Sequence, residues 1–190
     1  MKKDRALLII DVQKAFNDSK WGIRNNPNAE IKMKTVLEAC RKQNWWIIHI
    51  QHISQDSSSV FYKESAGVAF KKIVLPMKEE KVIQKTVNSA FIGTELEPFL
   101  KIKKIKTIAI MGLTTPHCVS TTARMSGNLG YKTYLLSDAT AAFGLYDEHE
   151  QFIEAETIHR ISLATIHDEF ATVIDSKSFL QGVLDSNTTN

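Results

Sequence analysis

Three reactive side chains, a carboxylate, an ammonium and a thiol, each stand at or just after the end of a short apolar run. They are Asp11, Lys85 and Cys118. A thiol becomes a nucleophile when a base removes its proton, and a carboxylate can act as that base if desolvation raises its pKa. A nearby lysine can hold the carboxylate, the thiolate and a later anionic intermediate. If the fold brings the three together, the sequence predicts a cysteine nucleophile.

The position of Cys118 at the start of an expected helix favours the same chemistry. Thr115 is expected to cap this helix and Pro116 to be its first residue, which places Cys118 in the first turn. There the free N–H groups and the positive end of the helix dipole favour a thiolate. The same N–H groups could hold a developing oxyanion.

Each of the three residues also has an ordinary structural explanation. Asp11 could close the turn after a strand, and Lys85 could be a solvated strand end. Free cysteines are among the most buried residues and are usually inert. Cys40 lies among apolar neighbours in the middle of an expected helix, so we expect it to be such a core thiol. The three residues taken together, rather than any one of them, favour catalysis.

Two histidine pairings are weaker candidates for a metal site. His49 and His52 are three residues apart on an expected strand, where the side-chain period of two puts their imidazoles on opposite faces. Glu156 and His159 are spaced for one helix face, but a carboxylate metal site of that kind needs a second matching limb. The sequence offers no such limb, so we expect a surface pair there.

The elements that must position these residues predict a parallel sheet. Apolar runs typical of strands lie at 6–10, 45–50, 81–85, 107–111, 132–136 and 171–174, with helical patterns at 28–43, 95–100, 116–128 and 147–167 between them. Continuous rather than alternating apolar runs indicate strands that are covered on both faces. Helix-length crossovers between such strands predict an α/β fold. Ligands of open parallel sheets bind at the carboxyl ends of the strands, where the reactive residues stand.

The organisation of the chain is expected to be simple. A length of 190 residues predicts one domain, here over residues 1–185, followed by a frayed tail at 186–190. The long segment 51–76 has no clear pattern of secondary structure. Segments of that length inside compact domains are usually functional or disordered.

Composition and charge exclude several classes of protein. A hydrophobic fraction of 43%, a charged fraction of 24% and a net charge of +3 exclude a disordered protein, a collagen, a coiled coil and a membrane protein. The dense basic cluster at 101–106 lacks interleaved aromatic residues and resembles a helix end, so we expect no nucleic-acid partner. Two distant cysteines, and apolar runs too short for a signal peptide or a membrane span, predict a cytoplasmic protein.

The motifs, read in order, resemble those of the isochorismatase-like cysteine hydrolases, a family that includes nicotinamidases, N-carbamoyl amidohydrolases and true isochorismatases. The matching pieces are 7–13 (LLIIDVQ) with Phe16, Lys85 with 89–91 (SAF), 112–119 (GLTTPHCV) with 121–124 (TTAR), Asp138 with Ala139, and Glu156 with His159 before 169–171 (EFA). They fall in the family's order and cover nearly the whole chain. Each motif alone is modest, and the ordered set is specific.

The resemblance implies a three-layer α/β/α sandwich around a six-stranded parallel sheet, with an Asp–Lys–Cys triad. Carried over to this sequence, Asp11 is the general base, Lys85 the electrostatic partner and Cys118 the nucleophile. The family also has a cis peptide bond before its oxyanion loop, which would fall between Leu113 and Thr114. That bond would direct the N–H groups of Thr114 and Cys118 into the site as an oxyanion hole.

Two departures from the family pattern bear on the reaction. Metal-binding nicotinamidases carry an Asp-x-His set and further histidines after the second strand, whereas here His52 is followed by 53–56 (ISQD) and the next histidine is His117. We therefore expect no metal and no other cofactor, and nicotinamide is a less favoured substrate. True isochorismatases often lack the thiol, so the presence of Cys118 favours acyl chemistry on an amide, imide or ureido group.

The function expected from these points is a metal-independent cysteine hydrolase that cleaves a small C–N bond through a thioester. Phe16, Trp21, Phe91 and His117 are expected to line a small flat pocket for a small-molecule substrate, with a core position as the alternative for Phe16 and Phe91. Two other functions stay open. One is hydrolysis of the isochorismate vinyl ether with Asp11 as an acid, and the other is a non-catalytic binding protein that keeps the fold.

The oligomeric state is expected from the resemblance alone. Relatives commonly form dimers or tetramers, so we expect a homo-oligomer. The segment 51–76 is long enough to reach a neighbouring subunit and close its pocket.

Overall fold

The centre of the molecule is a six-stranded sheet, seen in a computed structural model that describes residues 4–184. The strands are β1 Arg5–Ile10, β2 Trp46–His52, β3 Lys81–Lys85, β4 Thr107–Leu113, β5 Lys132–Ala141 and β8 Thr172–Ile174. Their order is β3-β2-β1-β4-β5-β8, and every neighbouring pair is parallel. The predicted parallel α/β architecture is confirmed.

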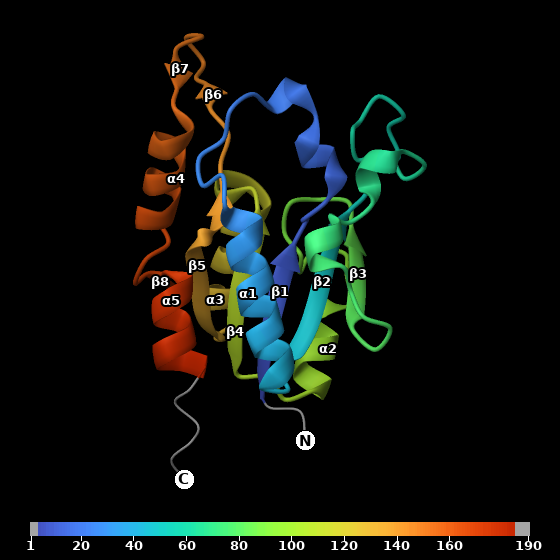
Figure 1. Cartoon of the computed structure of the whole chain (residues 1–190), viewed down its shortest axis with the longest axis vertical. Helices are drawn as coiled ribbons and strands as arrows, with labels where there is room; N and C mark the ends of the chain where they lie inside the picture. Colours follow the sequence, from blue (N-terminus) through green and yellow to red (C-terminus); the bar gives the residue numbers. More distant parts are fainter. Residues whose placement is uncertain (1–3, 185–190) are drawn as a thin grey trace.

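Helices cover both faces of this sheet, which explains why its central strands carry long apolar runs. The helices are α1 Ala29–Lys42, α2 Leu96–Ile102, α3 Ser120–Asn128, α4 Ala155–Ala164 and the short α5 Ser176–Ser178, which runs into a π-helical turn at Phe179–Leu184. Leu7 and Ile9 of β1 pack in one core with α1. Leu8 and Ile10 pack in a second core with α2 and α3. Figure 1 shows α1 in front of the sheet and α3 behind it.

The helix expected over 147–167 is shorter than its pattern predicted. Only Ala155–Ala164 form α4, and an antiparallel hairpin of β6 (Leu145–Tyr146) and β7 (Phe152–Ile153) precedes it. The hairpin stands above α4 in Figure 1. The prediction was wrong because apolar residues of β7 were counted as part of the helical period.

Local hydrogen bonds explain why a turn forms there instead of a helix. The Asp147 carboxylate accepts the N–H groups of His149 and Gln151 at 2.9 and 2.8 Å. Such side-chain to backbone bonds compete with helix formation. The rings of Tyr146 and Phe152 then meet across the two strands, with centroids 5.2 Å apart.

The segment between β2 and β3 lies against the exit of β1. It contains two 3-10 turns, Ala66–Val68 and Lys72–Val74. The N–H of Lys14 donates to the carbonyl of Ala69, and the N–H of Lys71 donates to the carbonyl of Val12, at 2.8 and 2.9 Å. The segment therefore covers the carboxyl edge of the sheet in its own chain.

None of the helices in the described part of the chain has the length and apolar character that a membrane span requires. The expected tail at 186–190 lies outside the described residues.

Candidate active site

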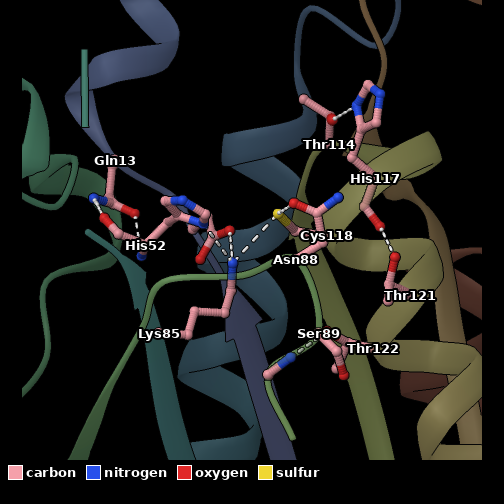
Figure 2. A network of polar contacts seen from close by, with 12 residues as sticks. Gln13, His52, Lys85, Asn88, Ser89, Thr114, His117, Cys118, Thr121 and Thr122 are labelled. Atoms are coloured by element: carbon pink, nitrogen blue, oxygen red, sulfur yellow. Dashed lines mark hydrogen bonds and ion pairs between the residues drawn. The ribbon is translucent and has the colours of Figure 1, made fainter. Parts of the chain in front are cut away.

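Four neighbouring strands deliver reactive side chains to the carboxyl edge of the sheet. Asp11 follows β1, His52 ends β2, Lys85 ends β3, and Cys118 follows β4 by a short loop. The Lys85 Nζ atom donates to Asp11 Oδ2 at 2.6 Å and to Cys118 Sγ at 3.3 Å. Figure 2 shows the Lys85 ammonium at the centre of these contacts. The structure thus brings the three reactive residues of the sequence together.

The backbone at the end of β1 holds Asp11 in an unusual conformation. Its φ of 51° lies in the left-handed region, which residues other than glycine seldom adopt. The N–H of Asp11 donates to the carbonyl of Ile50 in β2 at 3.0 Å, so the turn is fixed by the sheet. Residues held in such regions cluster at functional sites.

The three protons of the Lys85 ammonium have three acceptors. Besides Asp11 and Cys118, Nδ1 of His52 lies 3.0 Å from Nζ. An ammonium can only donate, so Nδ1 must accept, and a neutral imidazole then carries its proton on Nε2. Burial and the Lys85 charge lower the pKa of His52 to about 4. The ring is therefore uncharged at neutral pH, as this hydrogen bond requires.

Gln13 fixes the backbone that carries His52. Its amide nitrogen donates to the carbonyl of His52 at 2.9 Å and to the carbonyl of Val68 at 2.8 Å. Its amide oxygen accepts the N–H of His52 at 2.8 Å. Gln13 is fully buried, so these bonds tie the ends of β1 and β2 and the segment beyond into one rigid edge.

The pKa of the Cys118 thiol is higher than its position in the sequence predicted. Burial raises the pKa of Cys118, and the Asp11 carboxylate beside it raises that pKa further. Burial also raises the pKa of Asp11, against the opposing effect of Lys85. The raised pKa of Cys118 keeps its sulfur in the thiol form at neutral pH. The Oδ1 atom of Asp11 is buried and has no hydrogen-bond partner among the described residues.

The expected helix start also differs from the structure. Residues Thr115–Val119 form a π-helical turn, and α3 begins only at Ser120, so Cys118 precedes the regular helix. The Thr115 hydroxyl does not cap a helix. It lies 2.8 Å from Nδ1 of His159 on α4. His159 is buried, so the expectation that it forms a surface pair with Glu156 was wrong. Cys118 lies before the first regular turn of α3 and not within it.

The loop before Cys118 has the geometry that the family resemblance implies. The peptide bond between Leu113 and Thr114 is cis. The Thr114 hydroxyl lies 3.1 Å from Nδ1 of His117, and the N–H of His117 donates to the carbonyl of Thr114 at 3.2 Å. The loop is thus closed on itself beside the sulfur.

A small cavity opens onto the sulfur. It has a volume of about 240 Å³ and is lined by Asp11, Phe16, Trp21, His52, Phe61, Asn88, Thr114, His117 and Cys118. Phe16, Trp21 and His117 therefore lie where the sequence analysis placed them. Phe91 does not, because it is buried in the second core and stacks on Tyr131 with centroids 6.3 Å apart. Phe91 is therefore a core residue, which was the alternative expected for it.

Comparisons with known proteins show the family of the chain. The Isochorismatase domain model matches residues 5–178. The chain belongs to the isochorismatase family. It is 57% identical over 180 residues to the isochorismatase family protein YrdC of Bacillus subtilis, covering 95% of this chain and 96% of that one. The family is hydrolytic, as relatives with a named activity illustrate.

Two further relatives bear on fold and activity. The crystal structure of an isochorismatase-family protein from Chromobacterium violaceum superposes with a TM-score of 0.91 at 37% identity, over 95% of this chain and 94% of that one. The ureidoacrylate amidohydrolase RutB of Rhizobium rhizogenes is 28% identical over 103 residues, which is 52% of this chain and 40% of that one.

Three lining residues of this isochorismatase-family protein were missed by sequence reasoning. His52 was considered only as a metal ligand paired with His49, although its place at the end of a strand was a usable signal. Asn88, whose Oδ1 lies 3.7 Å from Cys118 Sγ, sits three residues beyond Lys85. Phe61 lies in the segment without pattern, which gave no signal.

The site also offers a set of metal-ligand types. Ligand atoms of Asp11, His52 and Cys118 lie within 4.8 Å of one another. The Lys85 ammonium contacts all three, at 2.6, 3.0 and 3.3 Å. A cation in the middle of this set would have to displace or deprotonate the lysine. The Lys85 ammonium therefore occupies the place that a metal ion would take among these three side chains.

Proposed function

We propose that this isochorismatase-family hydrolase cleaves a small C–N bond of an amide, imide or ureido group through a thioester on Cys118, without a metal. The observation that carries the proposal is the buried Lys85 ammonium, which joins a carboxylate and a thiol at the floor of a small cavity. The residues needed for nucleophilic acyl transfer thus face the same space.

The first step is proton transfer within the buried pair. Burial raises the pKa of both Asp11 and Cys118. Asp11 is therefore a stronger base than an exposed carboxylate, and its unpartnered Oδ1 can take the thiol proton. The thiolate that forms stays paired with Lys85, which limits the cost of the charge transfer.

The following steps use the same groups in turn. The thiolate attacks the carbonyl carbon, and the oxyanion is held by the N–H groups of Thr114 and Cys118. The carbon–nitrogen bond breaks as Asp11 returns its proton to the leaving amine or ammonia, which leaves a thioester. Asp11 then takes a proton from water, and the hydroxide attacks the thioester. The carbon–sulfur bond breaks, the acid is released, and Asp11 returns the proton to the Cys118 thiolate.

A second reaction has one observation in its favour. The raised pKa of Asp11 suits a general acid, and hydrolysis of a vinyl ether needs an acid that protonates carbon. That reaction forms no bond to sulfur. The thiol, which the lysine holds at 3.3 Å, would have no role in it.

The test is turnover of a panel of small amides, imides and ureido compounds by the wild type and by Cys118→Ala, with acyl-enzyme trapping followed by mass spectrometry. We expect the variant to lose about 10⁴-fold or more in kcat, because loss of a nucleophile removes the covalent path. The control is Cys40→Ala, which removes the core thiol and should keep turnover and trapping. A vinyl-ether substrate that Cys118→Ala still cleaves at the wild-type rate would establish the second reaction instead.

A further inference from the structure

We propose that the cavity selects uncharged, flat amides with an apolar group and rejects ligands that carry a carboxylate. This inference rests on the proposed cysteine-hydrolase function and narrows its substrate class. It follows from which charges line the cavity and which of them are already paired.

No lining residue offers a positive charge to an anionic ligand. Within the described part of the chain, the cavity lining contains neither arginine nor lysine. The nearest ammonium, that of Lys85, has fully buried side-chain atoms and already donates to Asp11, His52 and Cys118. Among the described residues that line the cavity, only Asp11 carries a charged group, and its carboxylate repels an anion. A second carboxylate in this space would have no cation left to pair with.

The two imidazoles that line the cavity are uncharged at neutral pH. Burial lowers the pKa of His117, and burial together with Lys85 lowers that of His52 to about 4. Protonated histidine is therefore unavailable as a carboxylate partner. Burying a carboxylate without a partner carries a large desolvation penalty.

Three aromatic residues, Phe16, Trp21 and Phe61, form one wall of the cavity. The Phe16 ring lies 5.3 Å from the Trp21 ring and 5.2 Å from the Phe61 ring, measured between centroids. Phe143 stacks against both Phe16 and Trp21, at 6.2 and 5.7 Å, so it fixes their orientation. Such a wall favours the face of a flat apolar group. The cavity volume of about 240 Å³ is below the range of about 300–1,000 Å³ that holds drug-sized ligands.

The Lys20 ammonium, beside the Trp21 ring, does not alter this balance. Lys20 places its ammonium 5.0 Å from the centroid of the Trp21 ring, and it does not line the cavity. A surface ammonium of this kind is solvated and screened by salt. Removing its charge is therefore a matched control.

The experiment compares two alkylating reagents of nearly the same size, neutral iodoacetamide and anionic iodoacetate, at pH 8. In both reactions the sulfur–carbon bond forms, iodide leaves, and the thiol proton passes to Asp11. The rate of modification at Cys118 is followed by mass spectrometry, and glutathione gives the intrinsic ratio of the two reagents. We expect the iodoacetamide-to-iodoacetate ratio at Cys118 to exceed that of glutathione by about tenfold or more, because only the anion must be desolvated without a partner.

Two variants assign the cause of that ratio. Asn88→Arg adds a guanidinium beside the sulfur, and we expect it to bring the ratio down to that of glutathione. Lys20→Met should leave the ratio at its wild-type value. A ratio that stays high in Asn88→Arg, or one that changes in Lys20→Met, would mean that the lining charges do not select the ligand.

The wild-type outcomes separate this inference from the function on which it rests. Modification by both reagents at the glutathione ratio overturns the substrate class and leaves the nucleophile intact. Failure of both reagents to modify Cys118 overturns the nucleophile, and the substrate class with it.

Discussion

Because the His52 imidazole is neutral, the Lys85 ammonium can donate hydrogen bonds to three acceptors. Lys85 donates to Asp11, to Cys118 and to Nδ1 of His52, so its direction is fixed without a second charge nearby. If His52 were protonated, it would offer Lys85 no lone pair and would place a like charge 3.0 Å away. The position of the lysine therefore depends on the protonation state of this ring.

The first prediction concerns the pH dependence of stability. Folding lowers the pKa of His52 from 6.5 to about 4, so between these values the unfolded chain binds more protons than the folded one. The free energy of unfolding therefore falls as the pH decreases through this range. His52 is partly exposed, so we expect its share to be about 0.5–1 kcal/mol per pH unit. Chemical denaturation between pH 4 and 7 should show a shallower slope for His52→Phe than for the wild type.

A matched variant separates titration from hydrogen bonding. His52→Gln cannot titrate, but its amide oxygen can still accept from Lys85. It should share the shallow slope of His52→Phe and keep more turnover at pH 7. Equal slopes in all three proteins would show that His52 titrates with an ordinary pKa in the folded state.

At the scale of elements, Gly112 allows β4 to pass closely against the end of β1. Its φ is 133°, and a Cβ atom added there would lie 2.1 Å from the carbonyl oxygen and 2.6 Å from the nitrogen of Ile10. These are backbone atoms of the residue before Asp11, so they cannot move without displacing the carboxylate. The position of Asp11 therefore requires glycine at position 112.

The second prediction follows from this contact. Gly112→Ala should lower the free energy of unfolding by about 3 kcal/mol or more, since both the φ value and the space oppose a side chain. Turnover per folded molecule should also fall, because Asp11 shifts. Gly182→Ala is the control, since nothing lies within 4 Å of the added Cβ there, and it should be nearly neutral. Thermal and denaturant unfolding with matched kinetics would reveal either result.

A buried carboxylate ties β2 to α1. Glu80 accepts from Arg41 of α1 at 2.7 and 2.8 Å, from Nε2 of His49 of β2 at 3.0 Å, and from the N–H of Met77 at 2.9 Å. Burial opposes its charge, but the bonds from Arg41 and His49 prevail and hold its pKa well below the usual range. These bonds position the strand that ends in His52.

The third prediction is that Glu80→Gln lowers the free energy of unfolding by about 2–4 kcal/mol, because it leaves Arg41 without its charge partner in a mostly buried place. The comparison is Glu95→Gln, which breaks an ion pair of the exposed Glu95 with Lys81 and should cost less than about 1 kcal/mol. Urea unfolding midpoints for both variants measure the difference. Similar losses in the two variants would contradict the burial argument.

Helices and strands could be predicted from the sequence where a helical period or an apolar run continues over the whole element. Five of the six strands lie within two residues of their expected limits, because strands covered on both faces carry apolar runs. The exception is β5, which continues five residues beyond its expected end at 136, to Ala141. The hairpin before α4 was not predictable in this way, since Phe152 and Ile153 fit a helical period as well as a strand. The choice between them depends on the Asp147 turn, which the period does not contain.

The candidate site was predictable where its residues end strands. Asp11 and Lys85 could be placed at one edge because a parallel sheet brings the carboxyl ends together. The partly exposed wall was less predictable, because Phe61 enters from a segment with no regular structure. The placement of Phe91 was wrong because nearness to Lys85 in sequence does not fix the direction of a side chain.

At the scale of the whole molecule, the sheet order interleaves the two halves of the chain. β1 and β2 come early in the sequence, yet they lie between β3 and β4, which come later. The oligomeric state stays a prediction, but the segment 51–76 need not reach a neighbour, since its Phe61 lines the cavity of its own chain.

The strand order also divides the chain into two parts, each of which holds only half of the candidate site. The exposed residues 55–58 separate a first piece, which holds Asp11 and His52, from a second, which holds Lys85 and Cys118. The second piece alone lacks the middle of its sheet, because the first supplies both strands between β3 and β4. We expect the two fragments, expressed separately, to be inactive and to regain turnover on mixing. Turnover would then measure the association of the two fragments. Fused to two other proteins, the fragments could therefore report whether those proteins bind each other.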